Sequence, residues 1–241
     1  MLAEVCTRVT SETFGRMAAR LLAIGVALAT IAGAAATTDA SGANGRVVGR
    51  VRLVAAQGAR ALVTSYSSRT LVPQGDPPRE IRNVVVSLQG MPSTPVALRH
   101  YQLRQEGELF LPHVLAIGRG GLVDFTNEDA FYHNVFSLSR AGTFDLGRFP
   151  RGQSRTRDFA KPGLVKVFCH LHSDMSAVIL VFDHPWFTTP DDAGAFVLTG
   201  VPPGHHVVAA WHERVGESRK TVDVPAGGDA TVEFELPVVE P

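Results

Sequence analysis

Short strand-like runs dominate this sequence and constrain its fold more than any other feature. They are rich in Val, Leu and Phe, and turn clusters of Gly, Pro and Asp separate them. No long helical period competes with these runs. The pattern therefore predicts an all-β protein built of sandwiches. The clearest runs span residues 46–54, 83–89, 121–127, 164–169, 177–182, 195–200, 205–212 and 230–236.

The spacing of the runs also suggests a domain organisation. The tail of the chain offers four strands, which are too few to close a sandwich and bury a core. Residues 45–92 offer two more, and the two pieces together reach about 100 residues, a normal domain size. We therefore expect one sandwich made of residues 45–92 and 185–238, with a second strand-rich block, residues 97–184, inserted between its halves. Two consecutive sandwiches, with 45–91 opening the middle block, remain the alternative.

An apolar run near the beginning of the sequence is typical of an export signal. Arg16 and Arg20 precede this run, which covers residues 21–36 and ends in small residues. It is shorter than the roughly 20 residues that a membrane span needs. Residues 1–36 are thus predicted to be a signal peptide, with Met17 as an alternative start. We expect a periplasmic protein with no membrane span in its mature chain.

The charge balance limits the classes of partner. Lys and Arg number 23, as do Asp and Glu, so the formal net charge is zero. Bulk electrostatics therefore gives no reason to expect nucleic acid or a charged membrane surface as partner. One local exception is a basic stretch, which is either an ordinary solvated loop or a docking face for an acidic redox partner. Its members are Arg140, Arg148, Arg151, Arg155, Arg157 and Lys161.

A lone cysteine carries the sharpest functional signal. Cys6 falls within the predicted signal peptide, which leaves Cys169 without a partner for an intramolecular disulfide. A free thiol in an oxidising compartment is a liability unless it is buried or bound to a metal. Cys169 opens the run CHLHSDM, which stands between two strand-like runs. The run places Cys169, His172 and Met175 on one hairpin loop at the spacing C-x2-H-x2-M.

This loop supplies most of a blue-copper ligand set, which consists of two imidazoles, a thiolate and a weak axial thioether. His133, in the run FYHNVFSLS, is the candidate for the second imidazole. Soft sulfur suits cuprous copper and nitrogen suits cupric copper, so a site with both serves either state. We predict one type 1 copper ion bound by His133, Cys169, His172 and Met175. His170 is expected to point the other way, toward solvent.

Two longer stretches, GGLVDFTNEDAFYHNVFSLS (120–139) and KPGLVKVFCHLHSDMSAVILV (161–181), resemble the plastocyanin, azurin and amicyanin group of cupredoxins. The resemblance implies a Greek-key sandwich in which His133 and His172 bind copper through ring nitrogens, Cys169 as thiolate and Met175 axially. It implies that Asn134 ties the two ligand-bearing segments together. It also implies that the edge of His172 serves as the electron port, framed by Leu171 and Phe131.

A further stretch resembles a different module. Residues 191–213, DDAGAFVLTGVPPGHHVVAAWHE, are similar to the D-x-x-G-x-F…G-V-P-P-G-x-Y pattern of carboxypeptidase regulatory-like sandwiches, with His206 in place of the tyrosine. The combination resembles exported bacterial proteins labelled methylamine utilisation proteins. The resemblance implies a prealbumin- or immunoglobulin-like sandwich beside the cupredoxin. Such a module binds or supports other groups, and its fold does not reveal its ligand.

Together these features predict an electron carrier and not an enzyme. The sequence contains no G-x-S-x-G, no H-E-x-x-H and no phosphate-binding loop. The expected partner is a redox protein such as a cytochrome or a periplasmic dehydrogenase. Two alternatives stay open. One is a copper storage or delivery protein, and the other is a carbohydrate- or protein-binding sandwich with a structural metal, for which zinc would accept Cys and His but gain little from a thioether.

Overall fold

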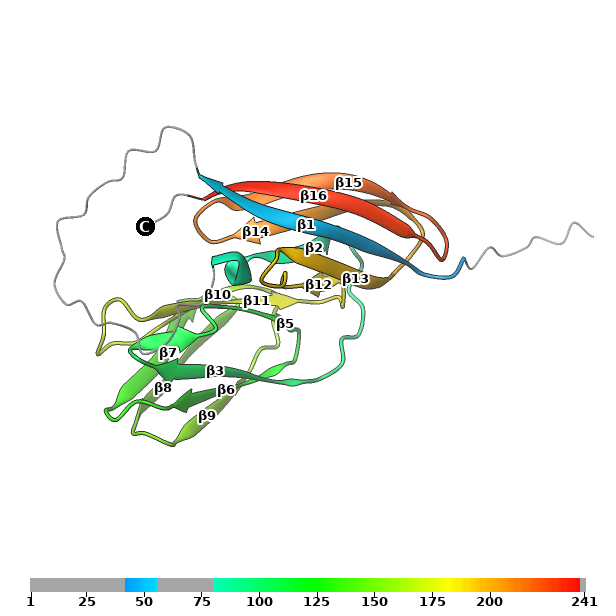
Figure 1. Cartoon of the computed structure of the whole chain (residues 1–241). Coiled ribbons are helices and arrows are strands. Elements are labelled where there is room, and N and C mark those ends of the chain that lie inside the picture. Colours follow the sequence, from blue (N-terminus) through cyan, green and yellow to red (C-terminus); the bar gives the residue numbers. More distant parts are fainter. Residues whose placement is uncertain (1–41, 56–79, 239–241) are drawn as a thin grey trace, which may run out of the picture. The chain divides into compact units, whose positions relative to one another are not determined.

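The computed structural model describes residues 42–55 and 80–238, and the predicted signal peptide lies outside these ranges. Within them the chain forms strands and one short 3-10 helix, η1, arranged as four sheets (Figure 1). The all-β prediction is therefore confirmed. None of the helical structure in these ranges is long and apolar enough to cross a membrane. In chain order the elements are β1 Gly45–Ala55, η1 Glu80–Asn83, β2 Val85–Gln89, β3 His100–Glu106, β4 Leu109–Leu111, β5 Val114–Gly118, β6 Leu122–Asn127, β7 His133–Ser139, β8 Gly142–Phe149, β9 Ser154–Asp158, β10 Gly163–Phe168, β11 Ser176–Phe182, β12 Phe187–Thr188, β13 Ala195–Val201, β14 Gly204–His212, β15 Gly216–Val224 and β16 Asp229–Val238.

Two of the sheets share one core, and we call this pair the terminal sandwich because both ends of the described chain contribute to it. Its sheets have the orders β13-β1-β16 and β12-β2-β14-β15. Strand β1 is central in its sheet, antiparallel to β13 and parallel to β16. The alternating apolar residues of these strands pack into one cluster, which includes Val47, Val86, Leu198, Val208 and Phe234. Period-two burial of this kind is what a half-buried strand produces.

The other two sheets form the central sandwich, built entirely from β3 to β11. Their orders are β5-β11-β10-β7-β8 and β4-β3-β6-β9. The core between them contains Phe125, Phe149, Val167 and Ile179, all fully buried. Cys169 and Met175 belong to the same cluster, so two of the predicted ligands sit at the edge of a packed apolar core.

Strand β11 is covered on both of its faces. Ala177, Ile179 and Val181 point into the core of the central sandwich. The residues between them on the strand join a third apolar cluster with Val85 of β2 and Trp211 of β14, both from the terminal sandwich. Burial on both faces explains why the sequence of β11, SAVILVF, is apolar without alternation. The two sandwiches therefore share an apolar contact at this strand.

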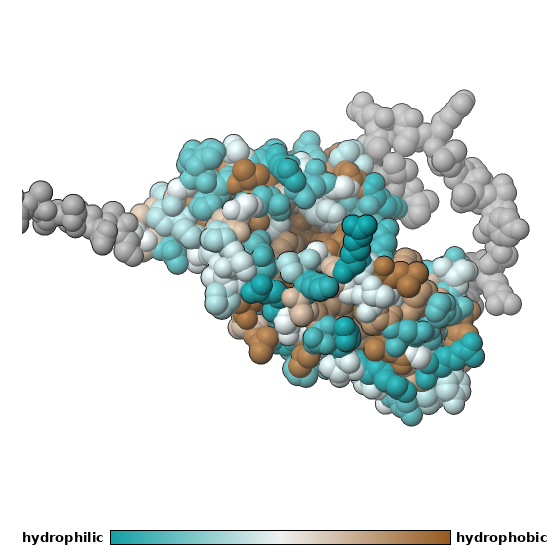
Figure 2. Space-filling model, turned by 180° about the vertical axis from the view of Figure 1, so that it is seen from behind, coloured by the Kyte–Doolittle hydropathy of each residue, from teal (hydrophilic) through white to brown (hydrophobic). Residues whose placement is uncertain are grey.

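Figure 2 shows one face of the protein, on which small groups of hydrophobic residues are separated by hydrophilic ones. Scattered apolar residues of this kind are normal on a protein surface.

Candidate metal centre

The structure brings three of the predicted ligands together at one end of the central sandwich. The sulfur of Cys169 lies 3.8 Å from Nδ1 of His133 and 3.7 Å from Nδ1 of His172. The ligand atoms of the three residues all lie within 4.8 Å of one another. His133 is 36 positions away from Cys169 in the chain, and the fold brings the two side chains into contact.

Strand pairing accounts for this meeting. Strand β10 lies between β7 and β11 in its sheet, and Phe168 of β10 pairs with Phe136 of β7. His133 opens β7, while Cys169 directly follows β10, so the two side chains come to the same end of adjacent strands. The antiparallel pair β10–β11 then closes the hairpin loop that carries His172.

Met175 lies at the end of the same loop. Its backbone N–H donates to the carbonyl of His172 (3.2 Å), and its own carbonyl accepts from the N–H of Cys169 (3.2 Å). The side chain is almost fully buried, at 1% exposure, in the apolar cluster that also contains Cys169. The fourth predicted ligand is thus held in a tight loop beside the other three.

The cluster is buried except on one side. His133 and Cys169 are buried, whereas His172 is partly exposed. The Phe131 ring, 42% exposed, lies 5.4 Å from the His172 ring and 5.1 Å from the His133 ring. Leu171 is also exposed. His172 is therefore the side of the cluster that faces the protein surface, with these apolar neighbours around it.

Asn134 links the two segments that carry the cluster. Its Oδ1 accepts from the backbone N–H of His170 (2.8 Å), and its Nδ2 donates to Oδ1 of Asp145 on β8 (3.0 Å). The adjacent His170 is exposed and turns away from the cluster. Its ring stacks on Phe136, with 3.7 Å between centroids and 5° between planes.

Asp129, which contacts the predicted ligand His133, was not predicted from the sequence. Its Oδ2 lies 2.7 Å from Nε2 of His133, whose side chain has no exposed surface. Because a carboxylate only accepts, Nε2 of His133 carries a hydrogen, and Nδ1 is the ring nitrogen that faces the sulfur of Cys169. Asp129 is fixed in turn by the N–H groups of Gly107 and Glu108, at 2.7 and 3.0 Å. The turn between β3 and β4 thus orients a predicted ligand through this carboxylate.

These contacts change the acidities of the groups involved. Burial opposes ionisation of Asp129, but hydrogen bonds from Glu108, His133 and Gly107 outweigh it and lower the pKa of the carboxyl group. Burial likewise opposes the charged form of His133, but Cys169 and Asp129 together raise the pKa of the imidazole. Burial would raise the pKa of the Cys169 thiol, yet hydrogen bonds from His133, from the Asn134 and Leu171 backbones and from His172 lower it to about 6.

A testable consequence is that the metal-free protein carries a thiolate at neutral pH. We expect the ultraviolet thiolate absorbance to titrate with a midpoint near pH 6, where an ordinary thiol has a pKa of 9.0. The thiolate should be present above the midpoint and lost below it. Cys169→Ala supplies the baseline of the measurement, and a midpoint close to 9 in the metal-free protein would contradict the geometry described here.

The donor set fits copper. Two imidazoles and an ionisable thiol lie close enough to share one ion, and a buried thioether stands on the same loop. Zinc would accept the same Cys and His residues. A thioether is the ligand that favours copper over zinc, because soft sulfur binds cuprous copper well.

The predicted basic stretch is divided between the two ends of the central sandwich. Arg148 pairs across the sheet with Asn134, at the end of β7 that carries His133. Arg140, Arg157 and Lys161 instead line a cavity of about 220 Å³ beside the β7–β8 turn. That turn lies at the other end of β7, about 20 Å away at the usual rise per residue. The six residues therefore do not all border the cluster.

Comparison with known proteins gives similarities to copper proteins in part of the chain. No protein-family model matches, and no curated protein matches. Among solved structures, a copper-containing nitrite reductase from Thermus scotoductus SA-01 is 27% identical, with a TM-score of 0.32, over 37% of this chain and 23% of its own. A purple cupredoxin from Nitrosopumilus maritimus is 26% identical, with a TM-score of 0.29, over 31% of this chain and 82% of its own. A reduced amicyanin variant is 16% identical, with a TM-score of 0.33, over 40% and 98%.

The match to the nitrite reductase thus spans less than a quarter of that protein. In the central sandwich, two facing sheets enclose the core, and the start of one strand and the loop after its neighbour supply a His, Cys, His cluster at one end.

Proposed function

We propose that this protein is a type 1 copper protein that carries single electrons between redox partners, with one copper ion held by His133, Cys169, His172 and Met175. The observation that carries the proposal is the preformed cluster, in which the Cys169 sulfur lies 3.7 and 3.8 Å from the two imidazoles. This ligand set is typical of blue-copper electron-transfer sites. We infer no enzymatic activity, because the proposed role needs no substrate to be transformed.

Bound copper would provide the one-electron oxidation and reduction, and the protein would hold the copper ligands in fixed positions. His133 is held by Asp129 on one side of its ring, and Met175 is held by two backbone hydrogen bonds. Ligands that are fixed in this way move little between oxidation states, and a small rearrangement makes electron transfer fast. The depressed pKa of Cys169 leaves the thiol ready to bind metal at neutral pH.

The partner we propose is a redox protein, such as a cytochrome or a periplasmic dehydrogenase, that contacts the His172 side of the cluster. Support comes from the partial exposure of His172 and from the exposed Phe131, Tyr132 and Leu171 nearby in the chain. Apolar and aromatic side chains of this kind are favoured at the centre of protein interfaces. A partner seated there would come within a short distance of the copper ligand.

We also propose a nested domain organisation, with a cupredoxin domain at residues 97–184 inserted into a carboxypeptidase regulatory-like sandwich at residues 45–92 and 185–238. The sheet orders support it, since β1 and β2 pair only with β12 to β16 among the described strands. The type of the terminal sandwich is proposed from the sequence pattern in residues 191–213. A periplasmic location is proposed from the apolar run at residues 21–36.

The test is to load the purified protein with copper and record its absorption spectrum. We expect one copper per chain and an intense blue colour that a reductant bleaches and an oxidant restores. A colourless or redox-silent product would refute the carrier function. A copper-loaded protein that rapidly yields Cu(I) to a competing chelator would favour copper delivery instead.

A further inference from the structure

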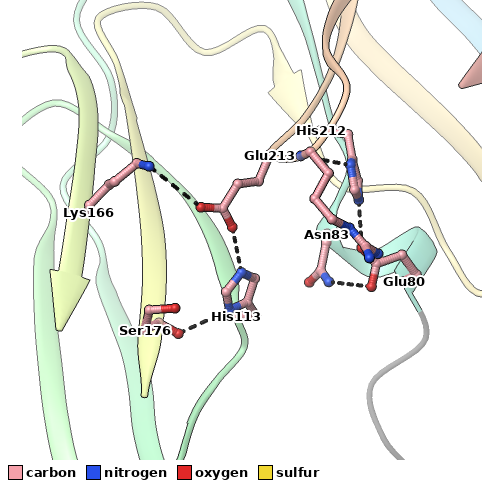
Figure 3. A network of polar contacts seen from close by, with 8 residues as sticks. Glu80, Asn83, His113, Lys166, Ser176, His212 and Glu213 are labelled. Carbon is pink, nitrogen blue, oxygen red and sulfur yellow. Dashed lines mark hydrogen bonds and ion pairs between the residues drawn. The ribbon is translucent and has the colours of Figure 1, made fainter. Parts of the chain in front are cut away.

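A polar network connects the terminal sandwich to Ser176, the first residue of β11 (Figure 3). Glu213, in the turn between β14 and β15, lies 2.7 Å from Nε2 of His113 through its Oε2. The other ring nitrogen of His113, Nδ1, lies 3.0 Å from the carbonyl oxygen of Ser176. Both of the atoms that face the ring of His113 are oxygens that can accept a hydrogen bond. The imidazole thus joins a carboxylate of one sandwich to the backbone of the other.

Ser176 is the residue at which this contact reaches the metal centre. It directly follows Met175 and opens β11, where it pairs with Phe168. Backbone hydrogen bonds of 3.2 Å each join Met175 to Cys169 and to His172. The His113 contact is therefore a side-chain restraint placed one residue beyond the proposed axial ligand.

The far end of the network is itself anchored. Lys166 of β10 lies 3.9 Å from the Oε1 of Glu213. The preceding residue, His212, is buried and lies 2.8 Å from Oε1 of Glu80 through its Nε2. Glu80 also accepts from Asn83 and is paired with Arg214 (Figure 3). The residues on either side of Glu213, His212 and Arg214, are therefore both bound to Glu80 of η1.

Apolar packing next to the network limits movement between the sandwiches. Val114 of β5 follows His113 directly, and it packs in the third apolar cluster with Val85 and Val178. The backbone N–H of Val178 also donates to the carbonyl of His113 (2.8 Å). His113 is thus held to β11 from both its backbone and its ring, which gives the Glu213 contact a firm base.

We propose that Glu213 and His113 are positioning residues for the metal centre, acting through the carbonyl of Ser176 to fix the placement of Met175. The inference rests on the proposed function, since it concerns the axial ligand of a copper site. It assigns the terminal sandwich a part in tuning the copper ion, because Glu213 belongs to that sandwich. Partners beyond the ligands themselves commonly tune metal sites in this way.

The experiment uses the full copper-loaded protein and measures reduction potential and absorption spectrum for Glu213→Gln. We expect one copper per chain, a retained blue colour and a raised potential, because a loosened Met175 stabilises the oxidised ion less. The matched control is Asp223→Asn, which removes a carboxylate paired with a histidine, His205, at the opposite end of the same β14–β15 hairpin. The control should keep the potential of the unaltered protein.

A double-mutant cycle separates positioning from the simple loss of a negative charge. A charge effect should add to that of Met175→Leu, whereas an effect through Met175 should vanish once this side chain is replaced. We therefore expect Glu213→Gln to cause no further shift in a Met175→Leu background. Additive shifts, or no shift in Glu213→Gln alone, would overturn the inference and leave the proposed function standing.

Two further outcomes are distinguishable. If Glu213→Gln does not fold, His113→Asn replaces it in the same cycle, because this change removes the ring contacts and leaves Glu213 near Lys166. If the unaltered protein binds no copper or is not blue, the proposed function fails, and the inference that rests on it fails too.

Discussion

Cys169→Ser should abolish the blue colour of the copper-loaded protein. The intense absorption of such sites comes from the bond between thiolate and copper, and a serine hydroxyl stays protonated at neutral pH. Copper affinity should fall by more than the roughly 10- to 100-fold that the loss of an outer partner costs. Absorption spectroscopy and competition with a copper chelator would measure the two effects.

A neighbouring histidine provides the control for this change. His170→Gln alters the residue next to Cys169, whose ring stacks on Phe136 away from the cluster. It should keep both the colour and the affinity. The prediction for Cys169 would be wrong if the serine variant stayed blue, or if His170→Gln lost its colour to the same degree.

Asp129→Asn should weaken copper binding by about 10- to 100-fold, the usual effect of losing a carboxylate behind a metal-binding histidine. The asparagine oxygen can still accept from Gly107 or Glu108, so the turn should hold. However, a neutral amide is a weaker acceptor for Nε2–H of His133 and no longer balances charge on the ring. The imidazole should then orient less firmly, and the loss would appear in chelator competition.

A matched carboxylate serves as the control. Asp124 on β6 accepts from Thr156 Oγ1 (2.6 Å) and lies 3.2 Å from Nδ1 of His100, without contact to the cluster. The pKa of its carboxyl group is also lowered, mainly by the Thr156 hydrogen bond. Asp124→Asn should therefore leave copper affinity unchanged. Equal affinities for the two variants would refute the orienting role of Asp129.

The sequence was sufficient to predict the part of the cluster that one loop holds. Cys169, His172 and Met175 lie within seven residues, so their proximity depends only on a hairpin. His133 required a fold that places β7 beside β10, and a resemblance was needed to select it. Asp129 was not predicted, because residues four positions apart in a loop, such as Asp129 and His133, need not lie close together in space. Its other partners, the N–H groups of Gly107 and Glu108, belong to a turn that is distant in the sequence.

The strands followed a similar rule. Strands that present a continuous or alternating apolar face, such as β6, β10 and β11, were evident from the sequence. Strand β9, SRTRD, was not, because it forms the edge of its sheet and carries arginines where apolar residues would be expected. Arg155 and Arg157 lie over the rings of Phe149 and Phe144, at 5.6 and 6.0 Å from their centroids. Their side chains cover the margin of the core, a function that hydropathy does not register.

The double coverage of β11 has a consequence for how this molecule can be divided. Val178, Leu180 and Phe182 form a continuous apolar row that Val85 and Trp211 cover from the other sandwich. If the central sandwich were produced without the terminal sandwich, this apolar row would be exposed to solvent and could associate with other molecules. The row lies on β11, the strand that begins next to Met175. Fusing the central sandwich to another protein would therefore require designed apolar side chains that bury this row in place of Val85 and Trp211.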